Sequence, residues 1–194
     1  MSRLRMLGNA AKPALWCLAT AIIINDKFFE IVSVNGPSMN PTLSPTFHET
    51  GERDYLLIDK WNATENLKRG DVISFFAPHA PETLAIKRIV GVEGDWVYKD
   101  SRRRPDIDFN AEAWDSMGEM LMVPFGHVWI EGDNFRNSRD SNWYGPISKS
   151  LVHGKAVCIV LPWKRFGLKP WEGFTSLTPV KKGQLVHSIA WEDL

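Results

Sequence analysis

The chain has 194 residues, and its 23 basic and 23 acidic side chains give a formal net charge of zero at pH 7. This length suits one domain with a substantial apolar core. The balanced charge, without a basic stripe interleaved with stacking aromatic residues, excludes a typical nucleic-acid-binding protein. The two cysteines, Cys17 and Cys158, do not make a disulfide framework, and no histidine stands at a metal-ligand spacing from another, so we expect no metal site.

The first 27 residues differ from the rest of the chain. Arg3, Arg5 and Lys12 precede an uncharged run at 14–24, which is shorter than the roughly 20 residues of a spanning helix unless it is extended backward. Three interpretations stay open: a membrane anchor, a cleavable signal peptide and a buried core helix. We favour an N-terminal membrane-anchoring helix over 1–27, with its basic end on the positive side of the membrane.

From residue 28 onward, short runs rich in Val, Ile, Phe and Tyr are separated by turn signals, several of which contain Gly-Asp. No long amphipathic helix is evident in this part. We therefore predict a mainly β domain over 28–162, built of antiparallel coiled sheets or a partly open barrel. The expected strands are 28–34, 55–58, 72–76, 84–92, 96–98, 127–130 and 155–161.

Two stretches depart from this pattern of short apolar runs and turns. Residues 101–122 open with three arginines and a proline and continue with scattered acids, which predicts a surface insertion or a charged docking site. The C-terminal tail, 163–194, has no clear period. Four of its residues either cover the end of the β domain or anchor a partner protein: Trp163, Arg165, Phe166 and Trp171.

A serine on a tight bend is the first candidate for chemistry. Ser38 follows Gly36 and Pro37 and precedes Pro41, and these neighbours favour a bent, preset backbone. A serine in such a loop commonly only caps a turn, so its position alone does not predict catalysis.

A lysine inside an apolar strand is the second candidate. Alternation along the strand places Lys87 on the same face as Ala85 and Ile89. Burial there would lower the pKa of the amine, so that it could remove the proton of a serine hydroxyl. The alternative is a lysine that reaches solvent from a strand edge. A polar loop at 131–146 offers hydroxyls and a carboxylate that could orient a neutral amine.

Taken in order, these segments resemble the type I signal peptidase family. The resemblance spans about 14–162, and four ordered boxes make coincidence improbable. The boxes are Gly-x-Ser-Met-x-Pro-Thr-Leu at 36–43, Arg-Gly-Asp-Val at 69–72, the Lys-Arg box with its Gly-Asp turn at 87–95, and Gly-Asp-Asn…Asn-Ser-x-Asp-Ser at 132–141. Within the family, the sequence is most similar to the mitochondrial inner membrane protease, specifically its subunit 2.

The resemblance implies a role for five residues. Ser38 would be the nucleophile and Lys87 the general base. Ser138 matches a loop serine that hydrogen-bonds the lysine amine, Asp140 the loop acid that braces it, and Met39 the methionine beside the nucleophile.

One position departs from the pattern of many bacterial members, which carry a hydroxyl residue two places before the nucleophile. Gly36 stands there in this chain. The backbone N–H of Ser38 can still donate to an oxyanion, whereas the second donor is not identified. Because one such donor is worth on the order of 10²–10³ in rate, we expect another group to replace it.

The resemblance also implies an activity and a location. The activity is that of a membrane-bound endopeptidase, without a cofactor, that removes presequences from precursor polypeptides delivered to the mitochondrial intermembrane space. The location is the inner membrane, with the β domain facing that space and a related subunit 1 as heterodimer partner. Two alternatives remain: a bacterial-type plasma-membrane signal peptidase, and a non-catalytic β-domain scaffold of a membrane complex.

Overall fold

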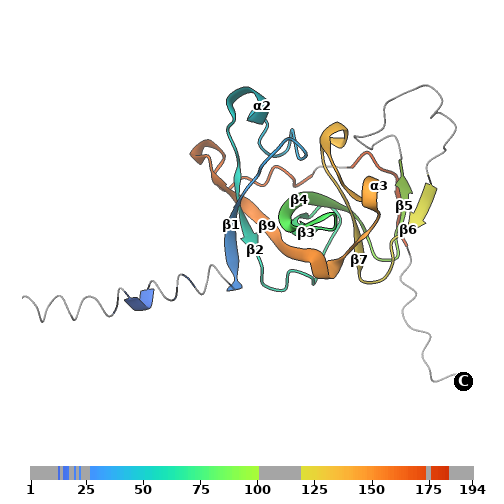
Figure 1. The fold of residues 1–194 in the computed structure, drawn as a ribbon, viewed down its shortest axis with the longest axis horizontal. Coiled ribbons are helices and arrows are strands. Elements are labelled where there is room, and N and C mark those ends of the chain that lie inside the picture. The colour runs from blue at the N-terminus through green and yellow to red at the C-terminus, as the bar shows by residue number, and fades with distance from the viewer. Residues whose placement is uncertain are drawn as a thin grey trace, which may run out of the picture.

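The computed structural model describes residues 13, 15–17, 20, 22, 27–100, 119–173 and 176–183. Two antiparallel sheets make up most of this part (Figure 1). The larger sheet has the strand order β1-β2-β9-β3-β4-β7-β8, and the smaller one β10-β5-β6. The prediction of a mainly β fold with antiparallel sheets is confirmed. The larger sheet consists of β1 (Phe29–Ser33), β2 (Tyr55–Asp59), β3 (Val72–Ala77), β4 (Ala80–Val92), β7 (His127–Glu131), β8 (Ile147–Ser148) and β9 (Val152–Leu161).

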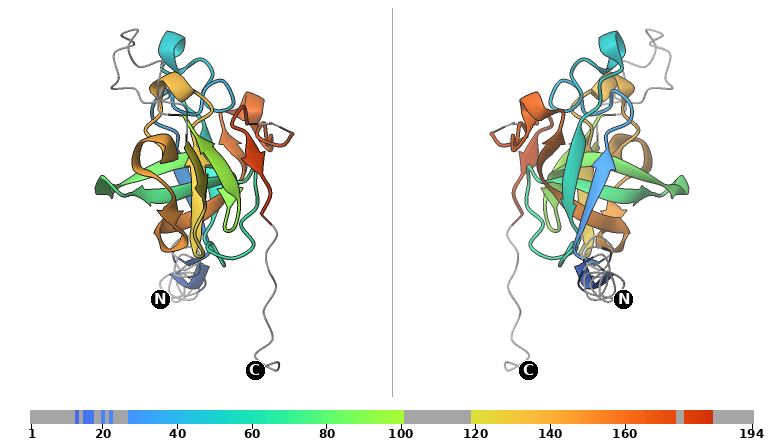
Figure 2. Two further views of the ribbon diagram at one scale, coloured as in Figure 1. Left: turned by 90° about the vertical axis from the view of Figure 1, so that its right-hand side faces the viewer. Right: turned by 90° about the vertical axis from the view of Figure 1, so that its left-hand side faces the viewer.

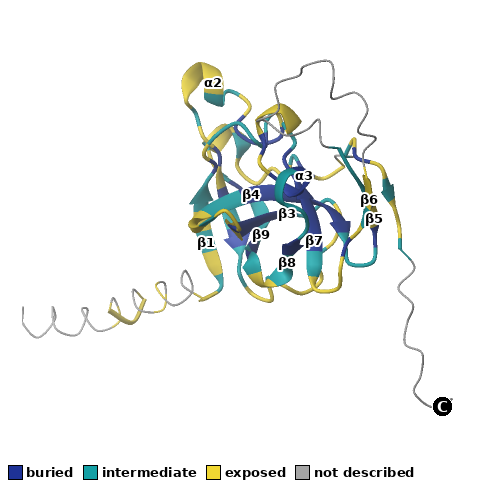
Figure 3. Ribbon diagram, turned by 45° about the vertical axis from the view of Figure 1, so that its right-hand side comes forward, coloured by how far each residue is buried: buried dark blue, intermediate teal, exposed yellow. Residues whose placement is uncertain are grey.

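The hairpin of β3 and β4 lies in the middle of the larger sheet, and all the strands expected there from the sequence are present. β4 begins at Ala80, earlier than expected, because three polar or exposed residues at 81–83 extend the hairpin beyond its apolar part. Figure 3 shows the dark blue, buried colour concentrated on β3, β4 and β7. Lys87 lies in β4 opposite Ile73 of β3, within this buried part.

The smaller sheet joins three distant parts of the chain: β5 (Trp96–Lys99), β6 (Glu119–Met122) and β10 (Val180–Lys181). Figure 2 shows β5 and β6 side by side in its left view, and β1 beside β2 in its right view. β6 falls within the stretch expected as an insertion, of which 101–118 lie outside the described residues. β10 comes from the tail, for which the sequence predicted no element.

Short helices occupy the connections. They are α2 (Phe47–Thr50), α3 (Ser141–Tyr144) and the 3₁₀ turns η3 (Phe135–Asn137), η4 (Lys149–Leu151) and η5 (Trp163–Arg165). The predicted membrane anchor falls mostly outside the described residues. Within the described part of the chain, no helix is long and apolar enough to cross a membrane.

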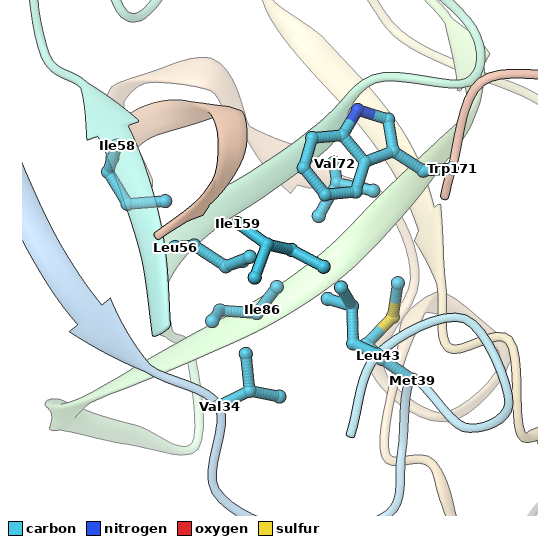
Figure 4. Packing of buried hydrophobic residues seen from close by; sticks show 9 residues of the cluster. All are labelled: Val34, Met39, Leu43, Leu56, Ile58, Val72, Ile86, Ile159 and Trp171. Carbon is cyan, nitrogen blue, oxygen red and sulfur yellow. The ribbon is translucent and has the colours of Figure 1, made fainter. Parts of the chain in front are cut away.

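The largest core cluster joins the bend that carries Ser38 to the tail. Met39 and Leu43 of the bend, Ile86 of β4 and Trp171 of the tail are buried in it. Figure 4 shows Met39 and Leu43 beside one another in this cluster, on the side away from Ile58.

The tail residues therefore divide into two groups. Trp171 is only 6% exposed, so it covers the end of the β domain rather than offering a contact surface. Trp163 and Phe166 are 78% and 56% exposed and pack on each other with ring centroids 5.5 Å apart.

Candidate active site

Ser38 lies in the bend after β1, and residues on both sides of it fix the backbone of this bend. Gly36 has φ +90°, a left-handed conformation that favours glycine. Within the bend, Asn40 N–H donates to Pro37 O at 3.0 Å and Leu43 N–H donates to Met39 O at 2.9 Å. Because the Met39 side chain is buried in the core, the backbone at Ser38 is fixed while its own side chain stays half-buried.

An acid just before β2 and a base in η5 brace the end of this bend. Ser44 N–H donates to Asp54 Oδ2 at 2.7 Å, and Asp54 N–H donates to Ser44 Oγ at 3.0 Å. Arg165 pairs with Asp54 and also donates to Thr42 O at 2.9 Å. The sequence suggested Arg165 as a possible surface contact. No local pattern pairs it with Asp54, because the two residues are 111 positions apart.

The structure brings Ser38 and Lys87 together. Lys87 Nζ lies 2.7 Å from Ser38 Oγ and donates to Ile86 O at 3.0 Å. Burial lowers the pKa of Lys87 from 10.5 to about 8, although the charges of Asp140 and Asp133 oppose part of that shift. With its side chain this close, the neutral amine can accept the hydroxyl proton of the serine.

Asp140 is the acid whose charge acts most on the Lys87 amine. It is buried and accepts from Ser138 Oγ at 2.6 Å, from Gly132 N–H at 3.0 Å and from Asn142 N–H at 3.1 Å. The family pattern implies that Ser138 hydrogen-bonds the lysine amine, whereas here the Ser138 hydroxyl donates to Asp140.

A buried ion pair holds the 132–134 segment against the bend. Arg88 donates through Nε and Nη2 to both Asp133 carboxylate oxygens, at 2.8 and 2.7 Å. Next to this pair, Asn134 N–H donates to Ser38 O at 3.0 Å, and its side-chain amide donates to Pro37 O at 3.1 Å. Because bidentate pairing fixes orientation, Arg88 positions the segment that contacts the backbone of Ser38. No sequence pattern predicted this role for Arg88.

Gly132 separates the two serines of the site. A Cβ atom at this position would meet Ser138 Oγ at 2.3 Å and the backbone oxygen of Ser38 at 2.5 Å. We expect Gly132→Ala to lower the rate of a reaction that depends on the Ser38–Lys87 pair by about 10², because a misplacement of about 1 Å costs that much. The measurement is kcat per folded molecule.

Gly91→Ala is the matched control, since its Cβ would meet Val97 Cγ2 at 2.6 Å in another core cluster. This variant should lose stability and keep the kcat of its folded fraction. A Gly132→Ala protein with the wild-type kcat would show that the contact with Ser38 does not position the nucleophile.

Metal chemistry has no candidate site in this part of the molecule. Across residues 27–100, 119–173 and 176–183, no group of three or more His, Cys, Asp or Glu side chains could hold a metal ion. Cys17 and Cys158 are both free.

Comparison with known proteins decides the family. The family model described as signal peptidase, peptidase S26, matches residues 7–103 and 97–163. The chain belongs to the S26 signal peptidase family. The resemblance predicted from the four boxes is thus confirmed, and membership in this family supports a serine peptidase, a hydrolase of peptide bonds.

Relatives in the S26 family match over most of their length. The mitochondrial inner membrane protease subunit 2 of Saccharomyces cerevisiae is 37% identical over 166 residues, 84% of this chain and 85% of that protein. Subunit 2 of Schizosaccharomyces pombe is 34% identical over 166 residues, 86% of this chain and 83% of that protein. Subunit 1 of Mus musculus is 34% identical over 168 residues, 84% of this chain and 89% of that protein.

The structural match with a solved signal peptidase I of Enterococcus faecalis V583 covers 47% of this chain and 97% of the solved chain. Its TM-score is 0.35 and its identity 22%, so the family assignment rests on the sequence matches.

Proposed function

We propose that this S26 peptidase is a membrane-bound serine endopeptidase that removes presequences from precursor proteins by acyl transfer through Ser38 and Lys87. The observation that carries the proposal is the 2.7 Å separation of Lys87 Nζ and Ser38 Oγ. The lysine is 5% exposed and its pKa is lowered to about 8, which suits a general base.

The mechanism follows from these positions. The neutral amine of Lys87 takes the proton of Ser38 as the serine oxygen attacks the scissile carbonyl. The backbone N–H of Ser38 donates to the oxyanion, and Gly36 leaves the second donor to another group. The protonated amine then gives its proton to the leaving peptide nitrogen. Once neutral again, it activates the water that hydrolyses the acyl-enzyme.

Three further residues position Lys87 or the Ser38 bend rather than contact the substrate. The charge of Asp140 counteracts part of the pKa depression of Lys87, and Ser138 orients Asp140 through its hydrogen bond. Met39 anchors the nucleophile bend in the core. These three are positioning residues in the proposed mechanism.

The subcellular location is proposed from the names of the relatives and from the exposed apolar side chains near the N-terminus. Because the relatives are named as mitochondrial inner membrane protease subunits, we assign the chain to that membrane, with its β domain in the intermembrane space. The side chains of Leu15, Trp16 and Ile22 are exposed, as are Phe29 and Ile31 of β1. These exposed apolar side chains support an N-terminal anchor ahead of β1.

The alternatives are less well supported. A bacterial-type plasma-membrane signal peptidase would share the site, but the mitochondrial names of the relatives favour the inner membrane. A non-catalytic scaffold does not explain why an amine is buried beside a serine, since burial of the charged form costs free energy without benefit to a scaffold.

The test is cleavage of a mitochondrial precursor by the purified full-length chain, with the new N-terminus sequenced. The proposal predicts one cut at the end of the presequence. Fractionation of the tagged protein should place it in the carbonate-resistant inner membrane, with the β domain open to protease from the intermembrane space. Absence of any cut, in the presence and absence of a co-expressed subunit 1, would contradict the proposed activity.

The exposed ring pair in the tail is the proposed contact for a related subunit. Trp163 and Phe166 are exposed and pack on each other, and aromatic residues tend to anchor interfaces. Replacing Trp163 and Phe166 together with Ala should reduce co-purification with subunit 1 by about tenfold or more. The fold should persist, because neither ring is buried in the core.

Trp96→Ala is the control for this prediction, since Trp96 is an exposed aromatic residue of the smaller sheet. It should leave recovery of the subunit unchanged. Equal recovery with the double variant would place the interface elsewhere.

A further inference from the structure

A chain of buried hydrogen bonds runs from the C-terminal tail to the acid beside the lysine. Thr178 Oγ1 lies 2.8 and 2.6 Å from the two Glu131 carboxylate oxygens. The side-chain amide of Asn142 donates to Glu131 Oε1 at 3.2 Å and to Asp140 Oδ1 at 3.3 Å. All four side chains are at most 6% exposed. The network is therefore shielded from bulk solvent.

Asn142 is the link between the two carboxylates. An amide nitrogen carries two protons, so it can serve Glu131 and Asp140 at the same time. Its Oδ1 accepts from Asp100 N–H at 3.1 Å, so the nitrogen of the amide is the atom directed toward the two carboxylates. Glu131 also accepts from Trp129 Nε1 at 2.9 Å. The orientation of the Asn142 amide therefore depends on how well the other donors satisfy Glu131.

Thr178 brings the tail into this arrangement. It precedes β10, which pairs with β5 in the smaller sheet, whereas Glu131 ends β7 of the larger sheet. The hydroxyl of Thr178 is thus a direct bond between the tail segment and the strand that leads into the Asp140 loop. Its backbone N–H is in turn fixed by Ser176 Oγ at 3.1 Å.

We infer that Thr178, Glu131 and Asn142 are positioning residues of the peptidase site, through which the seating of tail residues 176–180 sets the orientation of Asp140 toward Lys87. The inference rests on the proposed function for its kinetic consequence. Neither Thr178 nor Glu131 belongs to the family boxes, so the inference gives a role in catalysis to residues that the boxes do not include.

The pKa of Lys87 depends on the charged and polar groups around Lys87 and around Asp140. The Lys87 amine faces Ser38, Asp140 and Asp133, and Asp133 is paired with Arg88. The other groups that face Asp140 are the Gly132 N–H, the Ser138 hydroxyl, the Asn142 amide groups and the Tyr144 phenol, whose pKa is raised by burial and by the charge of Asp140.

Loss of the Thr178 hydroxyl should act on the lysine through Asp140. When Glu131 lacks this donor, the Asn142 amide turns toward Glu131 and its bond to Asp140 lengthens. Displaced from its place, Asp140 attracts the Lys87 ammonium less, so the pKa of Lys87 falls. We therefore expect a lower plateau of kcat and an acidic limb of the pH profile that moves to lower pH.

The test compares Thr178→Val with Thr178→Ser in the full-length chain. The valine variant should lose about 3–10-fold in plateau kcat, the range that one hydrogen bond covers, with KM unchanged. The serine variant retains the hydroxyl and should recover the wild-type kcat and pH profile. Thr46→Val is the control, because Thr46 Oγ1 also donates to a glutamate, Glu52, but away from the site.

A second variant and a second measurement keep the inference testable if Thr178→Val does not fold. Glu131→Gln retains the shape of the side chain and removes the charge that holds the Asn142 amide, so the orientation of that amide toward Asp140 changes, and both kcat and the pH profile should depart from those of the wild type. Titration of the Lys87 Cε resonance by NMR reads the same shift without cleavage. It therefore still reports on the network if the wild-type chain cleaves no precursor and the proposed function fails.

One set of results would overturn the inference. Folded Thr178→Val and Glu131→Gln proteins with lower melting temperatures, but with wild-type kcat and an unchanged Lys87 titration, would show that the network only stabilises the fold.

Discussion

Ser38→Ala is expected to lower the rate of precursor cleavage by at least about 10⁴ without unfolding the protein, as for loss of other serine nucleophiles. The bend keeps its backbone hydrogen bonds, and Met39 and Leu43 remain buried in the core. Only the hydroxyl 2.7 Å from Lys87 Nζ is lost. The measurement is single-turnover cleavage by the purified variant, with its folding checked by circular dichroism.

Ser33→Ala is the control, because Ser33 lies at the end of β1 before the same bend and is not in contact with Lys87. It should cleave at nearly the wild-type rate. A folded Ser38→Ala protein that cleaves the precursor as wild type does would remove the nucleophile assignment.

Lys87→Met should be as inactive as Ser38→Ala, because it retains length and apolar bulk but has no amine to accept the proton. It should also be more stable than wild type near pH 7. The difference between a pKa of 10.5 and one of about 8 corresponds to a cost of up to about 3 kcal/mol in the free energy of unfolding.

The direction of this stability difference follows from the protonation of Lys87 in the folded and in the unfolded state. Below pH 8 the amine is charged in both the folded and the unfolded state, so the cost of its burial is fully present. Between about 8 and 10.5 the unfolded state binds more protons, so wild-type stability rises with pH toward that of Lys87→Met. Denaturant unfolding of both proteins across this range measures the difference.

Lys155→Met is the control for both readouts, because Lys155 is a half-buried lysine of β9, two strands from Lys87 in the larger sheet. It should retain activity and show no comparable gain in stability. Cleavage by Lys87→Met at a wild-type rate would show that another group takes the proton of the serine.

The sequence predicts strands best where apolar residues recur in long runs. β3, β7 and the apolar part of β4 are such runs, and they form the buried centre of the larger sheet. β6, β8 and β10 were not predicted, because β8 and β10 have only two residues each and β6 is mostly exposed, so none of them shows the apolar pattern of a buried strand. β10 in addition depends on pairing with β5, more than 80 positions earlier in the chain, and no local pattern records such a pairing.

The site was predicted unevenly for a related reason. Ser38 and Lys87 are 49 positions apart, and only the ordered family boxes, not local composition, linked them before their contact was seen. The bonds of Arg165 to Asp54 and of Thr178 to Glu131 lie outside the boxes. They are set by which side chains the folded sheets bring together, so the sequence alone did not predict them.

The most direct test of the account is the pH at which Lys87 loses its proton. The Cε resonance of Lys87, assigned by its absence in Lys87→Met, can be titrated by NMR in parallel with kcat for precursor cleavage. Both midpoints should lie at about 8, with activity low below that pH and level above it. A Lys87 titration near its ordinary value of 10.5, or a kcat that is flat from acidic to alkaline pH, would contradict the assignment of Lys87 as the general base.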